Sequence, residues 1–167
     1  MNGELEAAGH GRWNLRFTRR LAHPVETVWR ALTEPEHLGA WFPQSIKGDL
    51  LTSGAPLRFE SEYGDFDGEV LAVSPPGLLE FLWGTDTVRF ELAPADGGSV
   101  LTLVDTIDEL GKAARDAAGW HTCLDFLEVE LAGATASWTV QERWTTVHPG
   151  YVDAFGPEAA TLGPPRG

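Results

Sequence analysis

One segment near the C-terminal end, Ala117 to Ala134, most constrains how this chain can fold. Each residue of an α-helix turns by about 100°, and the large apolar side chains of this segment then fall within about 60° of one another. This apolar stripe consists of Trp120, Leu124, Leu127 and Leu131, with Cys123 beside it. The pattern predicts a long helix lying on an apolar surface that the rest of the chain supplies.

The other side of this predicted helix is polar. His121, Asp125 and Glu128 follow one another at spacings of four and three, so they share one side. His121 and Asp125 are the catalytic candidates, because a carboxylate one turn away can orient an imidazole as a general base. The alternative, which we favour, is a solvated polar stripe, since these residues point about 90° to 130° away from the middle of the apolar stripe.

Gly119 and Cys123 in the same segment bear on how closely the predicted helix packs and which side chains it buries. Glycine inside a helix costs about 1 kcal/mol relative to alanine, so Gly119 predicts a close approach to another surface. Cys123 is turned about 160° from His121 at helical spacing, which argues against a Cys/His catalytic pair. We expect Cys123 to be a small buried apolar residue.

The chain before this helix is a series of short runs separated by turn residues. The alternation of Trp13, Leu15 and Phe17 with polar residues predicts a half-buried strand. Two short helices follow, one opened by Pro24 and one by the capping-box spacing of Thr33 and Glu36. Further strands are predicted over 45–50, 56–63, 66–74, 78–84, 87–93 and 99–105.

The short connections between these runs imply antiparallel pairing, in a sheet of about seven strands with one face covered by the long helix. The predicted fold class is therefore α+β. Its predicted organisation is a flexible leader over residues 1–11, a single domain over 12–156 and a disordered tail over 157–167. After the long helix, Trp138 to Val147 predict another helical piece, broken at Pro149, in which Trp138 and Trp144 pack within the chain or, less favoured, form a homodimer contact.

Composition excludes several classes of partner. A formal net charge of −13 disfavours nucleic acid and anionic lipid, because both depend on Lys and Arg neutralising phosphate. No apolar run is long enough for a membrane helix or a signal peptide. With a single cysteine, no internal disulfide is possible, so we expect a soluble, cytoplasmic protein.

Motifs for metal or nucleophilic chemistry are absent from the sequence. The five histidines show no zinc-binding spacing, and there is no G-x-S-x-G elbow or phosphate-binding glycine loop. Four carboxylates on one predicted hairpin, Glu60, Glu62, Asp67 and Glu69, could bind calcium, but a solvated sheet face explains them better. We expect no metal and no cofactor.

Several stretches nevertheless carry a family resemblance. They are VETVWRALTEPEHLGAWFPQ, then Gly68 and Val70 before Pro75, LLEFLWG, GGSVLTLVDT and GWHTCLDFL, with Trp144, Val147-His148, Tyr151 and Phe155-Gly156 after them. Over roughly Arg16 to Gly156 the chain resembles the SRPBCC (START-like) superfamily, and within it a bacterial group named after the activator of the heat-shock-protein ATPase. The resemblance implies a helix-grip fold, with a curved antiparallel sheet around a long C-terminal helix and an apolar cavity between them.

The implied cavity selects candidate ligand-binding residues on the small helices, the strands and the long helix. They are Trp29, Leu32, Leu38, Trp41, Phe42, Phe59, Val70, Trp83, Phe90, Trp120, Leu124 and Leu127. An aromatic-rich wall suits a planar or greasy molecule of modest size, whereas the alternative is that these side chains simply fill the core.

Three functions are compatible with the resemblance, since a fold alone does not fix an activity. The favoured one is binding of a small hydrophobic or aromatic molecule, lipid- or polyketide-like. The alternatives are a cyclase, aromatase or hydrolase that uses the same cavity, and regulation of a chaperone ATPase. A chaperone partner is the least favoured, because eukaryotic activators carry a separate N-terminal domain for much of that contact, which we do not expect here.

Overall fold

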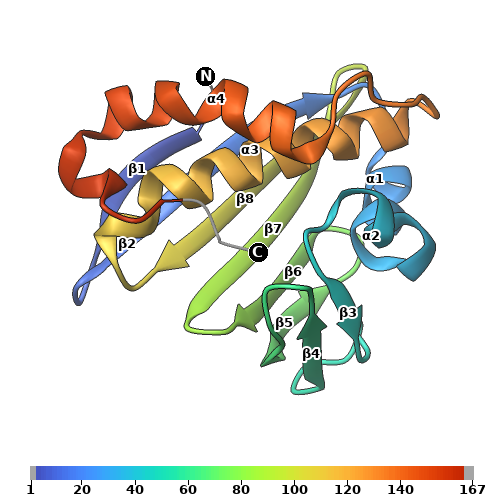
Figure 1. The fold of residues 1–167 in the computed structure, drawn as a ribbon. Helices are drawn as coiled ribbons and strands as arrows, with labels where there is room; N and C mark the ends of the chain where they lie inside the picture. Colours follow the sequence, from blue (N-terminus) through green and yellow to red (C-terminus); the bar gives the residue numbers. More distant parts are fainter. Residues whose placement is uncertain (1–2, 164–167) are drawn as a thin grey trace.

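A computed structural model describes residues 3–163 and shows an eight-stranded antiparallel sheet with helices on one face (Figure 1). The strands lie in the order β1-β2-β8-β7-β6-β5-β4-β3. Their bounds are β1 (Gly3–Gly9), β2 (Arg12–Leu21), β3 (Ser45–Lys47), β4 (Pro56–Glu60), β5 (Phe66–Ser74), β6 (Leu78–Trp83), β7 (Asp86–Ala95) and β8 (Gly98–Ile107). The α+β helix-grip architecture expected from the sequence is confirmed.

The middle of the sheet is made by β8, which pairs with β2 on one side and β7 on the other. Every second residue of β8 is buried, from Ser99 through Leu101, Leu103 and Asp105 to Ile107. This alternation follows from the pleat, which turns successive side chains to opposite faces of the sheet. Asp105 belongs to this buried set, so a carboxylate lies on the core face of the sheet.

The N-terminal segment differs from the sequence-based prediction. Instead of a flexible leader over residues 1–11, Gly3–Gly9 form the edge strand β1 and raise the strand number from about seven to eight. Backbone pairing with β2 holds this polar strand. The Gly3 backbone N–H also donates to the Tyr151 hydroxyl at 3.2 Å, and a Cβ at Gly3 would lie 2.8 Å from that oxygen. Composition alone could not show this contact with the far end of the chain.

The two short helices are α1 (Val25–Thr33) and α2 (Pro35–Trp41). The predicted capping box at Thr33 and Glu36 is wrong, because Thr33 ends α1 and its hydroxyl donates to the Trp29 carbonyl. Glu34 is the N-cap of α2, and Pro35 supplies the first helical residue, where a missing N–H costs nothing. Figure 1 shows both helices beside the end of α3 that lies nearest the β3 side of the sheet.

The long helix is α3 (Ala113–Leu131), preceded by the short 3₁₀ turn η1 (Leu110–Lys112). It buries Trp120, Leu124 and Leu127 against the sheet, as the apolar stripe predicts. No close approach is found at Gly119, since a Cβ placed there would meet nothing within 4 Å. The expectation of a packed glycine at this position is therefore wrong.

The last helix, α4 (Val140–Phe155), runs beside α3 across the same face (Figure 1). A capping box between Thr139 and Glu142 starts it. The predicted break at Pro149 does not occur, because Pro149 is exposed and water can solvate the carbonyl that it leaves without a helical donor. Trp144 packs within the chain, as favoured, and donates from Nε1 to the Arg115 carbonyl at 3.2 Å.

The tail also differs from its prediction in the part that the structure describes. Pro157–Ala160 form the 3₁₀ turn η2, with Ala159 buried, rather than a disordered segment over 157–167. The Leu162 N–H donates to the Gly111 carbonyl at 3.1 Å, which ties the tail to η1. Residues 164–167 of the predicted tail lie outside the described residues. Within residues 3–163, no helix is long and apolar enough to cross a membrane.

Two glycines allow a matched test of this packing. A Cβ at Gly68 would lie 2.1 Å from the Leu82 carbonyl oxygen and 2.6 Å from the Phe59 ring, so Gly68→Ala should lower the free energy of unfolding by about 1–3 kcal/mol or more. Gly119→Ala should instead raise it by about 0.5–1 kcal/mol, because the helix gains an alanine in open space. Urea denaturation of both variants checks the pair, and a destabilised Gly119→Ala would contradict the described packing of α3.

Candidate functional site

The predicted ligand-binding residues come together between the sheet and the helices. Eleven of the twelve are buried in one core cluster, and Trp83 is half-buried against it. The aromatic members pack ring against ring, with the Phe42 ring centroid 5.9 Å from Trp120 and 6.2 Å from Phe59, and the centroids of Trp83 and Trp120 5.2 Å apart. The aromatic cluster, as we call it, consists of Trp41, Phe42, Phe59, Phe66, Phe81, Trp83, Phe90 and Trp120.

The aromatic cluster reaches the surface at one end. Trp83 and Phe66 are partly exposed, and the Trp83 indole Nε1 donates to the Gln44 side-chain oxygen at 3.0 Å. Gln44 follows Phe42 and Pro43 in the connection between α2 and β3. A separate open hollow of about 280 Å³ is lined by Arg89, Glu91 and Thr102, among others, on the sheet face opposite the cluster.

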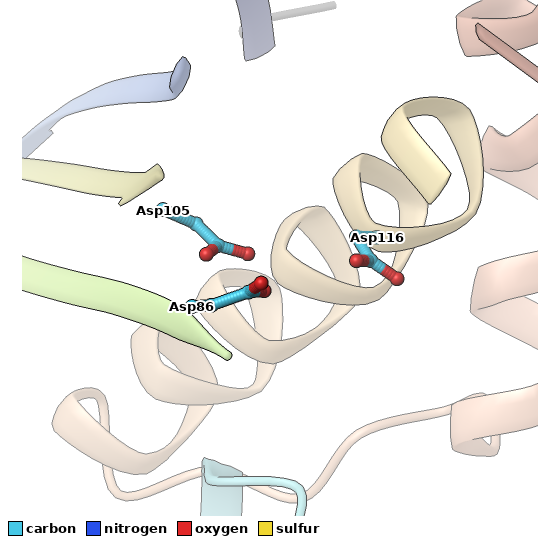
Figure 2. A group of neighbouring side chains, drawn as sticks. All are labelled: Asp86, Asp105 and Asp116. Carbon is cyan, nitrogen blue, oxygen red and sulfur yellow. The ribbon is translucent and has the colours of Figure 1, made fainter. Parts of the chain in front are cut away.

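Beside Trp83 and Trp120 the aromatic cluster borders a group of acids, the buried Asp86 and Asp105 and the half-buried Asp116 (Figure 2). Asp86 begins β7, Asp105 lies near the end of β8, and Asp116 lies in the first turn of α3. The side chain of Asp105 has 0% exposure and that of Asp86 has 5%. The Trp120 indole Nε1 donates to Asp105 Oδ2 at 2.8 Å, so one ring of the aromatic cluster is held by one of the acids.

Burial changes the protonation of these acids. Loss of hydration raises the pKa of Asp86 to about 6, although the ammonium of Lys112 acts in the opposite direction. The pKa of Asp105 lies well above its ordinary value because the group is fully buried and faces the charge of Asp86. Neither Asp86 Oδ1 nor Asp105 Oδ1 has a hydrogen-bond donor. A proton shared between the two carboxyls satisfies both oxygens, as expected for close buried acids.

Two cations accompany the acids. Lys112 Nζ lies 3.6 Å from Asp86 Oδ1 and 2.7 Å from Asp108 Oδ1, so it serves two carboxylates. Arg115 Nε pairs with Asp116 Oδ1 at 2.8 Å. Burial raises the pKa of Asp116 despite this arginine. The acids are therefore only partly compensated by protein cations.

The sequence-based interpretation missed this acid group and predicted no metal-ligating residues. A signal was present, because Asp105 continues the buried alternation of β8 and Asp86 continues that of Val88, Phe90 and Leu92 in β7. Aspartate is seldom fully buried unless it is paired, so an Asp at a core position predicts a partner group nearby. The register that brings Val88 opposite Asp105, and hence Asp86 diagonal to it, could not be read from the sequence.

The catalytic candidates His121 and Asp125 are close together, with His121 Nε2 3.5 Å from Asp125 Oδ2. They do not form the predicted solvated stripe, because α4 covers this side of α3 and leaves His121 9% exposed. His121 Nδ1 lies 2.7 Å from the Tyr151 hydroxyl, which itself accepts from the Gly3 N–H. A neutral imidazole satisfies both ring contacts, because its Nδ1 accepts from the Tyr151 hydroxyl and its Nε2 carries the proton on the side of Asp125.

Asp125 is held by two arginines. Arg19 Nη1 donates to its Oδ1 at 2.7 Å, and Arg143 Nε donates to its Oδ2 at 2.6 Å. Burial lowers the pKa of His121, and repulsion by the two arginines adds to the effect. Burial also raises the pKa of Tyr151 to about 12. These bonds join α4 to α3 and β2, and they occupy the polar atoms of His121 and Asp125 with partners from within the chain.

Two further predictions concern Cys123 and the acidic hairpin. Cys123 is buried, and burial raises the pKa of its thiol to about 12, which confirms a small apolar role. Of the four hairpin carboxylates, Glu62, Asp67 and Glu69 are exposed and Glu60 is half-buried. Asp67 pairs with Arg58 at 2.9 Å. Among residues 3–163 this hairpin is not one of the groups close enough to share a metal ion.

The matched family and solved structures agree with this fold. The family described as activator of Hsp90 ATPase homolog 1-like protein matches residues 22–132, from the end of β2 through α3. The chain belongs to this family. In this AHSA1-like protein, α4, with Arg143 and Tyr151, lies beyond the matched stretch. No curated protein matches the chain.

Among solved structures, the AHSA1-like chain is similar to EF2215 from Enterococcus faecalis, a conserved protein of unknown function, with a TM-score of 0.73 and 18% identity over 93% of this chain and 92% of that one. It is similar to CalU16 from Micromonospora echinospora, with a TM-score of 0.72 and 21% identity over 93% and 99%. DynU16, from the dynemicin biosynthetic locus, has a TM-score of 0.64 and 28% identity over 71% of this chain and 47% of that one. The first two likenesses support the fold alone.

Replacing Asp105 tests the shared proton. The folded acids hold a proton that an unfolded carboxyl releases near pH 3.8, so the free energy of unfolding should fall as pH rises from about 4 through the Asp86 pKa of about 6. Asp105→Asn can keep the Trp120 bond and donate its amide to Asp86. It should therefore be more stable than wild type at pH 7 by about 1–3 kcal/mol and lose the part of this slope that Asp105 contributes. Urea denaturation at pH 4.5 and 7 measures the stability difference and its pH dependence. Asp67→Asn, at an exposed position, is the control and should keep the pH dependence of the wild type.

A second pair of variants tests the bridge between the arginines. Asp125→Ala leaves Arg19 and Arg143 without a shared carboxylate and should lower the free energy of unfolding by about 3 kcal/mol. Glu128→Ala removes a 44% exposed side chain that contacts the same Arg19 one turn later, and should cost less than about 1 kcal/mol. Equal losses in thermal denaturation would show that Asp125 has no special role.

Proposed function

We propose that this protein binds a small hydrophobic or aromatic molecule, lipid- or polyketide-like, between the sheet and α3. The observation that carries the proposal is the aromatic cluster, whose rings contact one another from buried Phe90 and Trp120 to partly exposed Trp83 and Phe66. A continuous aromatic surface gives a planar ligand stacking and edge contacts in place of those between the protein's own rings.

The proposal requires one ring to give way to the ligand, and Phe42 is the candidate. It follows the last residue of α2, has an extended backbone and precedes Pro43. Its ring lies against Trp83 at 6.3 Å and Trp120 at 5.9 Å, between the exposed end of the aromatic cluster and its interior. A movement of the connection from Phe42 to Gln44 would open the space beside Trp83 without disturbing the strands.

The family context supports a small organic ligand. DynU16 is a protein of the dynemicin biosynthetic locus, and it is 28% identical to this chain over 71% of the chain's length. The cyclase, aromatase or hydrolase alternative has less support, because its candidates His121 and Asp125 are bonded to Tyr151, Arg19 and Arg143 rather than facing the aromatic cluster. Binding without reaction is therefore the function we propose.

Two half-buried tryptophans provide a matched experiment. Nile red is a suitable probe because it is neutral and is not repelled by the acidic protein. Wild type should bind it with a fluorescence increase, and Trp83→Ala should weaken binding by about tenfold, or 1.4 kcal/mol. Trp138→Ala, which packs on Phe126 away from the aromatic cluster, should bind as wild type does.

The natural ligand is sought by native mass spectrometry of protein purified gently from its own host. An extra mass of roughly a few hundred daltons, lost on denaturation, is expected for a ligand of ordinary pocket size. Absence of both the extra mass and dye binding would refute the proposal. Equal weakening in the two tryptophan variants would place the binding elsewhere.

A further inference from the structure

The buried Asp86 and Asp105 and the half-buried Asp116 have the geometry of a cation site. One carboxylate oxygen from each of Asp86, Asp105 and Asp116 lies within 4.8 Å of the others. Oxygens around a calcium ion lie at about 2.3–2.6 Å from the metal, so pairs of ligands can be up to about 5 Å apart. These spacings therefore permit a single ion to contact all three side chains.

The two least exposed acids each have one oxygen that accepts no hydrogen bond beside this space. Asp86 Oδ1 and Asp105 Oδ1 have no hydrogen-bond donor, and their residues are 5% and 0% exposed. Figure 2 shows the carboxylates of Asp86 and Asp105 turned toward one another beside the turn of α3 that carries Asp116. The other oxygen of Asp105 accepts from Trp120, which fixes the rotation of that carboxylate. Buried carboxylate oxygens without a donor require a proton or a metal.

The local charge favours a divalent ion. Within residues 3–163, the cations that pair with the group of Asp86, Asp105, Asp116 and Asp108 are Lys112 and Arg115, so the fully ionised group has an excess of two negative charges. Lys112 is already shared between Asp86 and Asp108, and it lies 3.6 Å from the oxygen of Asp86. One divalent cation would neutralise the excess.

We propose that Asp86, Asp105 and Asp116 bind one hard divalent cation of the calcium type. Carboxylate oxygens are ligands of hard cations, and each of the three can bind through one or two oxygens. Calcium tolerates such irregular coordination, whereas magnesium needs a near-octahedral site with several waters. Binding displaces the proton held between Asp86 and Asp105 to solvent, so the ion and the proton compete for the same oxygens.

The position of the site gives the ion a structural role. Asp86 starts β7, Asp105 is on the neighbouring β8, and Asp116 lies on α3, so one ion joins two strands to the helix that covers them. The side chains of Asp116 and Lys112 retain 16% and 17% exposure, which provides a route from solvent. The proposal does not depend on the binding of an organic ligand.

The test uses full-length protein freed of metal with a chelator and then dialysed. Calorimetric titration with calcium chloride should show one site, and excess calcium should raise the Tm by several degrees. Asp105→Asn should weaken calcium binding by more than about tenfold, since even loss of an outer partner has that effect. Asp67→Asn, an acid of the exposed hairpin, should bind calcium as wild type does.

Manganese, a paramagnetic substitute, gives a second readout. The wild type should broaden and reduce the signal of free manganese in electron paramagnetic resonance, and Asp105→Asn should not.

Three results would overturn the proposal. The first is wild-type protein that shows neither calorimetric heat nor a Tm shift with calcium at millimolar concentration, which would mean that the acids hold a proton only. The second is equal calcium binding by wild type and Asp105→Asn when circular dichroism shows both folded. The third is loss of binding in Asp67→Asn as great as in Asp105→Asn, which would indicate general attraction to an acidic surface. Should Asp105→Asn fail to fold, Asp116→Asn provides the same comparison from the less buried ligand.

Discussion

The hydrogen bond from the Trp120 indole to Asp105 fixes how α3 sits on the sheet. A helix that packs only by an apolar stripe can rotate by some degrees at small cost, whereas a buried hydrogen bond to a charged or protonated acid selects one orientation. In this orientation Leu124 and Leu127 face the strands, and Trp120 closes the aromatic cluster against Phe42 and Trp83. One interaction thus joins the core, the proposed ligand site and the buried acids.

The fold deals with buried charge in two different ways. Beneath α4, Asp125 is matched by Arg19 and Arg143, so charge is balanced by side chains of the chain itself. Beside the start of α3, one oxygen of Asp86 and one of Asp105 have no hydrogen-bond donor from the described residues, so the pair needs a shared proton or an ion. Removing a partner is costly in the first case, while neutralising a member is favourable in the second.

Periodicity was enough to predict the main elements from the sequence. The alternation in β2 and the apolar stripe of α3 are confirmed, because each reports directly which side chains face the core. Three features were not predicted from the sequence. The Gly3 contact of β1 and the cover over His121 both involve Tyr151, which is distant in sequence, whereas α4 continues through Pro149 because that residue is exposed. The resemblance supplied the fold but not the acid group beside Trp120.

The edge strand β1 depends on the end of the chain. Gly3 contacts Tyr151 across a sequence separation of 148 residues, and beyond this bond β1 is paired on one side only. During synthesis on a ribosome the first strand therefore emerges long before the helix that secures it. The sheet from β2 to β8 can assemble earlier, whereas the bond from Gly3 to Tyr151 requires α4, so this edge of the sheet stays open to wrong partners until α4 is in place.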